Sequence, residues 1–241
     1  MRKLPVFLML LILSCDDAST GQEFVTYTVH GVGDSSNSEM ISEDGWTVNM
    51  TKAQLVVGSI KLCSHVPSFY NKSDSLTECG QVMGEMTTAK AFDFIEDTES
   101  ELGIMDGISG QVNSTFYNHG YIWLTTQGEP VSLSDDLDGL SALVEGTATK
   151  DASSFEFRLE IELLPNRKGN DLISGISASG YIDTSITRLE VRSDPRNWLR
   201  YIDFGKMACE EEICTLTEGS TLWNSFYYGI VQGGQLEFEW K

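Results

Sequence analysis

An acidic segment near the middle of the chain places oxygen ligands at the spacing of a calcium-binding loop. Within 134–139 and the residues after it, Asp136, Asp138 and Glu145 take the third, fifth and twelfth positions of such a loop. Ser134 replaces the usual first aspartate, and neither flank has a strong helical pattern. The segment is therefore a candidate calcium site, and an acidic surface loop is the alternative interpretation.

The chain has three histidines, and two of them are candidates for a transition-metal site. Neutral imidazole is the commonest protein ligand for such metals, so His65 or His119 could combine with nearby carboxylates. No pair of histidines has the close spacing of a local metal motif. Surface or loop histidines without a metal are the alternative.

Four of the five cysteines are candidates for disulfides. Cys63 and Cys79 are separated by fifteen residues, whereas Cys209 and Cys214 enclose four. Four cysteines allow three pairings, and we favour the one that closes the two short loops. A four-thiolate zinc site is the competing hypothesis, but these spacings do not match its usual ligand pairs.

Patterns for covalent or acid–base catalysis are weak. Segment 175–180 approaches the nucleophile elbow of serine hydrolases, but Ser179 stands where the second glycine belongs, and a flexible turn explains the segment better. Paired carboxylates for glycoside cleavage depend on a separation in three dimensions, which the sequence does not give. We therefore predict no catalytic residue and no enzyme.

Many short strands are expected to position these residues. Phe155, Phe157, Leu159 and Ile161 alternate with charged residues, the pattern of a strand with one wet face. Polar segments over 33–42 and 64–88 are predicted to be a break and a long loop. Other strands are predicted over 22–29, 46–62, 91–95, 110–116, 121–125, 141–148, 153–163, 180–191 and 235–240.

Two short helices complete the expected fold. Asp194-Pro195 supplies an N-cap and a first-turn proline ahead of Trp198. A second apolar run at helical spacing, from Leu222 to Ile230, is predicted to pack as a cap on the sheet. Together these elements predict an all-β, mainly antiparallel fold, of the β-sandwich or jelly-roll type, in a single domain over 23–241.

The N-terminus has the layout of an export signal. Met1-Arg2-Lys3 precedes an apolar run from Leu4 to Leu13, and polarity changes abruptly after Cys15. Ten residues of helix cover only about 15 Å, half of the hydrocarbon core, so the run is too short to span a membrane. We predict a signal peptide over 1–14 and a short tether over 15–22.

The residues Ile12-Leu13-Ser14-Cys15 resemble the lipobox of bacterial lipoprotein precursors. The pattern departs from the lipobox at Leu13, where a smaller residue is usual. The resemblance implies that Cys15 carries diacylglycerol, that the chain is cut before it, and that the new amine is acylated, often with palmitate. An ordinary secretory signal cut near Ala18 is the alternative. The segment at Trp46 and the terminal 238–240 also resemble secreted Gram-negative lipoproteins, a likeness that carries no functional residue.

The net charge narrows the class of partners, and the cysteine count agrees with lipid on Cys15. The formal charge is −20, and removing Arg2 and Lys3 leaves −22, a surface that repels nucleic acid and concentrates cations. Export favours disulfides, and lipid on Cys15 leaves four cysteines to pair.

We therefore expect a non-enzymatic lipoprotein of the bacterial cell envelope. A lipid would hold it at the membrane, and its β-rich domain would bind a small ligand or an envelope protein without a resident cofactor. The alternatives are a protein that handles calcium or a transition metal and a carboxylate-dependent glycoside hydrolase.

Overall fold

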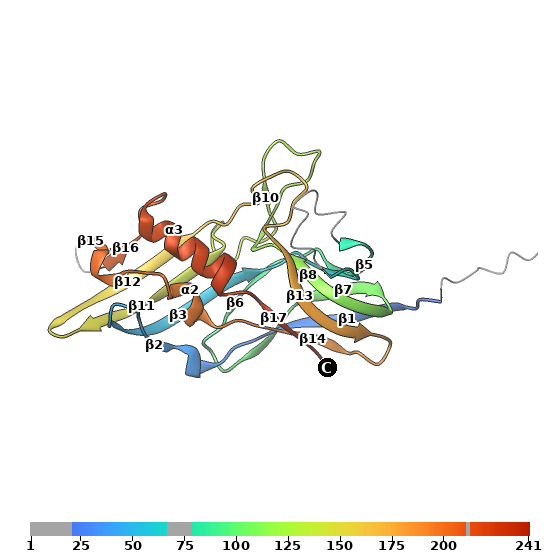
Figure 1. The fold of residues 1–241 in the computed structure, drawn as a ribbon, viewed down its shortest axis with the longest axis horizontal. Helices are drawn as coiled ribbons and strands as arrows, with labels where there is room; N and C mark the ends of the chain where they lie inside the picture. The colour runs from blue at the N-terminus through green and yellow to red at the C-terminus, as the bar shows by residue number, and fades with distance from the viewer. Residues whose placement is uncertain (1–20, 67–78, 211–212) are drawn as a thin grey trace, which may run out of the picture.

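The computed structural model describes residues 21–66, 79–210 and 213–241, which form an all-β fold with two short α-helices (Figure 1). Two large sheets, named A and B here, contain nearly all of the strands. The predicted fold class is confirmed. The predicted signal peptide and Cys15 lie outside the described residues. No helix in the described ranges has the length and apolarity needed to cross a bilayer.

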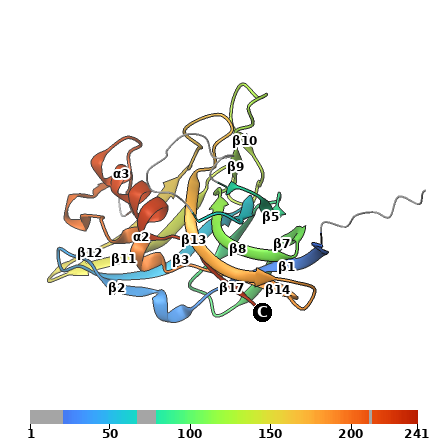
Figure 2. The same cartoon turned by 45° about the vertical axis from the view of Figure 1, so that its right-hand side comes forward.

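Sheet A has eight strands in the order β13-β8-β4-β5-β7-β1-β14-β17. Its strands are antiparallel except where β1 runs parallel to β14. The sheet curls so that β13 at one edge comes beside β17 at the other, where the Trp240 ring covers Gly180 (Figure 2). In chain order the bounds are β1 Phe24–Val32, β4 Ile60–Cys63, β5 Val82–Met86, β7 Glu99–Ile108, β8 Gly110–Tyr117, β13 Ile173–Ile182, β14 Arg188–Arg192 and β17 Glu237–Trp240.

Sheet B has seven strands in the order β15-β16-β12-β11-β3-β2, with β6 paired to β3 beside β2. Its one parallel pair is β12 with β16. A separate ribbon joins β9 Tyr121–Ile122 to β10 Val131–Ser132. The bounds in sheet B are β2 Glu39–Ile41, β3 Thr47–Val57, β6 Lys90–Asp93, β11 Ala142–Lys150, β12 Ser153–Ile161, β15 Ala208–Glu210 and β16 Ile213–Thr215.

The two sheets enclose one hydrophobic core. On β12, Phe157, Leu159 and Ile161 are buried while the charged residues between them are exposed, as the alternation predicted. Each such buried side chain stabilises the fold by roughly 1.5–3 kcal/mol. The chain passes from sheet B to sheet A between Val57 and Ile60, which are both buried. The core is therefore continuous across the two sheets.

Both helices form where the sequence predicted them, one from its Asp194-Pro195 cap and the other from its helical spacing of apolar residues. Asp194 caps α2, Pro195–Leu199, and accepts a hydrogen bond from the backbone N–H of Arg196. Trp198 in α2 is fully buried and meets Phe94 edge to face. Helix α3, Thr221–Tyr228, continues into a π-helical turn over Gly229–Gly233, and 3-10 turns lie at Ser35–Asn37 and Phe204–Lys206.

Several parts of the structure differ from the prediction. Strand β7 was not predicted at all, and β5 lies inside the segment predicted to be a loop. The segment over 180–191 was predicted as one strand but contains the end of β13 and most of β14, and the residues over 175–180 belong to β13 instead of a turn. The predicted break over 33–42 contains the short strand β2.

Candidate functional site

A groove lies where strand β16 leaves strand β12 and the chain turns into helix α3. The parallel pairing of these strands ends at Arg158 and Thr215. Beyond that point α3 stands beside the remaining part of β12, and the space between them is about 490 Å³. We call it the α3 groove; its lining consists of Leu140, Glu160, Ile161, Glu162, Leu164, Asn166, Leu216, Glu218, Trp223 and Tyr227.

One wall of the groove is an aromatic pair on α3. Trp223 and Tyr227 are four residues apart, so they share a helix face. Their rings are stacked, with centroids 5.9 Å apart and an angle of 20° between the planes. Ser220 fixes the start of the helix by accepting a hydrogen bond from the Trp223 backbone N–H at 3.1 Å. Both rings also pack against the core, which was their predicted role.

The opposite wall carries carboxylates. Glu160 and Glu162 project from the same face of the chain as it leaves β12, and Glu218 lies between β16 and α3. All three are exposed. Arg158 pairs with Glu160 at 2.6 Å but does not line the groove, and among the described residues no lysine, arginine or histidine does. The groove therefore has a negative potential beside a flat apolar surface.

A tyrosine beside Glu162, outside the lining of the groove, stays protonated. The Tyr121 hydroxyl donates a hydrogen bond to the Gly139 carbonyl oxygen at 2.6 Å. Burial, together with the hydrogen bond and charge of nearby Glu162, raises the pKa of Tyr121 to about 12. Tyr121 is therefore a neutral hydrogen-bonding group at physiological pH, and it supplies neither charge nor base.

The structure does not assemble the predicted calcium loop. Asp136 accepts a hydrogen bond from the Ala91 backbone N–H at 2.9 Å. Asp138 lies in a turn with a φ of 53°. Glu145, which should close the calcium cage, instead lies on strand β11, where it pairs with Lys52 at 3.4 Å and with Arg158. Glu145 lies on an extended strand, so its carboxylate pairs with basic side chains of the two neighbouring strands. The calcium prediction is therefore wrong for Glu145.

The two candidate metal histidines lie in different surroundings. His65 is exposed at the end of β4, beside Gly80. His119 is fully buried, and its Nδ1 lies 3.0 Å from the Val56 carbonyl oxygen. Burial lowers the pKa of His119 to about 4, so its ring is neutral at physiological pH. No three metal-binding side chains are grouped in the described part of the chain.

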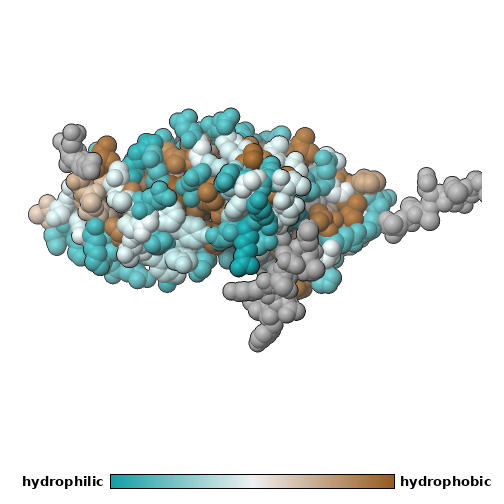
Figure 3. Space-filling view, turned by 90° about the horizontal axis from the view of Figure 1, so that it is seen from above, coloured by the Kyte–Doolittle hydropathy of each residue, from teal (hydrophilic) through white to brown (hydrophobic). Residues whose placement is uncertain are grey.

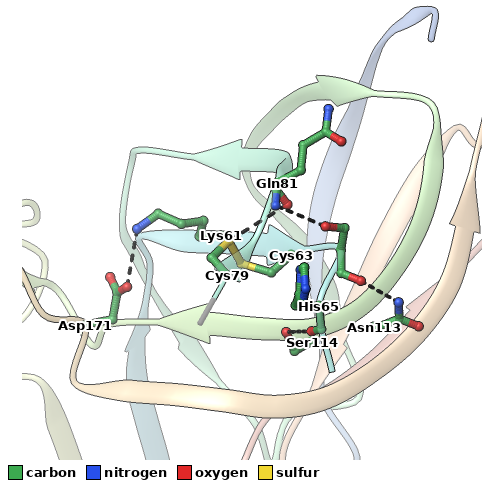
Figure 4. Close-up of a disulfide and its surroundings, with 9 residues drawn as sticks. Lys61, Cys63, His65, Cys79, Gln81, Asn113, Ser114 and Asp171 are labelled. Atoms are coloured by element: carbon green, nitrogen blue, oxygen red, sulfur yellow. Dashed lines mark hydrogen bonds and ion pairs between the residues drawn. A yellow bond between two sulfur atoms is a disulfide. The ribbon is translucent and has the colours of Figure 1, made fainter. Parts of the chain in front are cut away.

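Both favoured disulfides are present. Cys63 bonds to Cys79, and Cys209 bonds to Cys214 across the β15–β16 hairpin. Figure 4 shows the first bond beside β4, where Ser114 donates a hydrogen bond to the His65 carbonyl oxygen at 2.6 Å. These contacts tie the chain after β4 to β8. The four cysteines are therefore structural, and a thiolate zinc site is excluded for them.

A charged network on the outer face of sheet A was not predicted. Glu190, 4% exposed at its side chain, pairs with Arg188 at 2.5 Å and with Arg192 at 2.9 Å. Burial alone would raise the pKa of Glu190, but Arg192, Lys241 and Arg188 together hold it below its usual value. The alternation of Arg188, Glu190 and Arg192 along the sequence is the signal for this network. The acidic and basic side chains of this network pair with one another, so we assign the network a structural role.

Comparison with known proteins gives little beyond the fold. No family model matches the chain, and no curated protein is significantly similar in sequence. A solved structure similar to it is MbnP from Methylosinus trichosporium, with a TM-score of 0.44 and 12% sequence identity. The match covers 86% of this chain and 87% of that chain. At this similarity the likeness carries no conclusion about a ligand.

Proposed function

We propose that this protein is a lipid-anchored, non-enzymatic binding protein of the bacterial cell envelope, and that the α3 groove binds an organic cation with an apolar part. One observation carries the choice of ligand. The groove places the stacked pair Trp223–Tyr227 beside three carboxylates, and no basic side chain from the described part of the chain lines it. The anchoring part of the proposal rests on the lipobox resemblance at Cys15.

The physical chemistry of the groove favours such a ligand. A cation near the face of an aromatic ring is attracted by the ring quadrupole, by about 0.5–2 kcal/mol according to its desolvation. Glu162 and Glu218 add a Coulombic attraction that falls with ionic strength. The formal charge of −20 also raises the concentration of cations around the whole molecule. Methylene or methyl groups on the ligand would pack on the aromatic rings.

A glycan is the second candidate ligand, because flat aromatic rings also stack on sugars. If the protein also cleaved that glycan, Glu160, Glu162 or Glu218 would supply the catalytic carboxylates of a glycoside hydrolase. Glu160 and Glu162 leave β12 on the same side, so of these three only Glu218 approaches from another element. A metal-handling function finds no supporting donor set among the described residues.

Titration with spermidine, a flexible polyamine protonated at neutral pH, tests the proposal. We expect saturable binding by calorimetry at low salt, and binding roughly tenfold weaker in Trp223→Ala and in the double variant Glu162→Gln/Glu218→Gln. Removing either the aromatic face or the charge should have a similar effect, because both contact the same ligand.

Glu39→Gln/Glu101→Gln is the matched control, since it removes the same charge from exposed residues of β2 and β7. Equal weakening in both double variants would mean that spermidine senses only net charge, and the groove proposal would be wrong. Cleavage of a neutral β-linked oligosaccharide, lost in Glu218→Gln, would establish the hydrolase instead.

A further inference from the structure

One end of sheet A exposes apolar side chains at the point where the described chain begins. Phe24, the first residue of β1, has an exposed fraction of 90%, the highest among the large apolar residues of the described chain. Phe24 lies on the outer face of the sheet, whereas Ile108, its partner on β7, is partly buried and packs against the core. Ile104, also on the outer face of β7, is 53% exposed.

The neighbouring strands bring an exposed tyrosine to the same end. Ser109, in the turn between β7 and β8, binds the start of β1 through two hydrogen bonds of 2.8 Å with Glu23. Two residues later Gln111 pairs with Tyr181, near the end of β13, and Tyr181 is 61% exposed. Phe24 and Tyr181 therefore lie at one rim of the curled sheet. Figure 3 shows brown, apolar surface at this end of the molecule.

We propose that this rim, formed by Phe24 and Tyr181, rests on the surface of the lipid bilayer that anchors the protein. The inference depends on the proposed lipidation of Cys15. Eight residues separate Cys15 from Phe24, and the nine residue steps between them span at most about 30 Å. The start of β1 is thus held close to the membrane whatever path the segment takes. Phenylalanine and tyrosine at such a position partition into the interface between headgroups and acyl chains.

The charged side chains near the rim indicate which lipid headgroups the rim can contact. Glu23 and Asp106 are exposed beside Phe24, and Glu85 pairs in register with Asp106. Anionic headgroups would repel these carboxylates, whereas zwitterionic headgroups would not. The rim therefore fits a bilayer of zwitterionic lipid. Contact at this end directs the α3 groove, which belongs to sheet B, away from the membrane edge of sheet A.

Fluorescence quenching in vesicles tests this contact. The full lipidated chain is reconstituted in phosphatidylcholine vesicles that contain acyl-brominated lipid, and the fluorescence added by Phe24→Trp is measured relative to the parent chain. We expect bromine to quench most of the added signal. Ile41→Trp is the matched control, because Ile41 is 75% exposed on β2 in sheet B, and its added signal should survive.

Flotation of the same vesicles distinguishes the proposed lipid anchoring from the proposed contact of the rim with the bilayer. If the protein floats with the vesicles but the Phe24→Trp signal is not quenched, anchoring holds and the docked rim is wrong. If the protein does not float, the anchoring proposal fails and the docked rim fails with it. Replacing part of the phosphatidylcholine by phosphatidylglycerol should reduce quenching, and unchanged quenching would contradict the preference for zwitterionic lipid.

Discussion

We expect the Cys15→Ser variant to lose the proposed acylation of the chain and the proposed cleavage before residue 15. The expected result is loss of incorporated palmitate and a mass that corresponds to an altered N-terminus. The physical reason is that the Cys15 thiol is the only atom of the lipobox that can carry diacylglycerol. Two or three acyl chains give stable anchoring, whereas a polar chain without them has no comparable affinity for the bilayer. Palmitate labelling, membrane fractionation and intact-mass measurement report the change.

Ser14→Ala is the matched control, because it keeps a small residue before the cysteine. It should be labelled, processed and fractionated like the parent protein. If Cys15→Ser leaves both processing and fractionation unchanged, the lipoprotein interpretation is wrong. An N-terminus near Ala18 in the parent protein would identify an ordinary secretory signal in its place.

We expect the folded protein to lose about 3 kcal/mol of stability through one side chain as the pH falls from 6.5 to 4. Burial lowers the pKa of His119 from 6.5 to about 4. Between these values the unfolded chain binds a proton that the folded chain does not, so acid favours unfolding. Each pKa unit corresponds to about 1.4 kcal/mol, and the difference here is about 2.5 units. The contribution of His119 is fully present above pH 6.5.

Denaturant unfolding at pH 7 and pH 4.5 measures this loss, and His119→Gln isolates it. The amide can still donate to the Val56 carbonyl oxygen, but it does not titrate, so the variant should lose most of the pH dependence in this window. His65→Gln changes an exposed histidine and should keep it. Equal pH dependence in the parent and in His119→Gln would contradict the assignment.

Other titratable groups change the total pH dependence of stability, but they do not change the difference between the parent protein and His119→Gln. Burial raises the pKa of Asp93, so this carboxyl group opposes His119 by favouring the folded state in acid. Hydrogen bonds to Ser35 lower the pKa of Asp97, and its contribution is lost only at more acidic pH. Comparison of the variant with the parent removes both effects, because both groups are present in each protein.

The elements with strong local signals could be predicted from the sequence, and those dictated by neighbours could not. The alternation on β12 and the Asp194-Pro195 cap both appear in the structure. Strand β7 was missed because its pattern is interrupted by Gly103 and Gly107. A Cβ on Gly107 would lie 2.2 Å from the Met83 carbonyl oxygen of β5, so these small residues are required by the adjacent strand. This steric requirement can be recognised only when the pairing of β7 with β5 is known.

The same distinction holds for the sites. The disulfides were predictable because short sequence separation brings cysteines together. The calcium prediction failed because Glu145 belongs to a long strand and meets cations on the strands beside it. The α3 groove could not be predicted, since Glu162 and Glu218 are far apart in sequence and meet only through the pairing of β12 with β16. The helical spacing of Trp223 and Tyr227 indicated a helix, but not what it faces.

The central claim is that the α3 groove binds an organic cation, and the indole N–H signals of the five tryptophans test it most directly. In a proton–nitrogen correlation spectrum of the full chain, the Trp223 signal is assigned by its loss in Trp223→Phe. We predict that spermidine shifts the Trp223 signal in a saturable way and leaves that of the buried Trp198 unmoved. A stationary Trp223 signal at saturating spermidine would contradict the account.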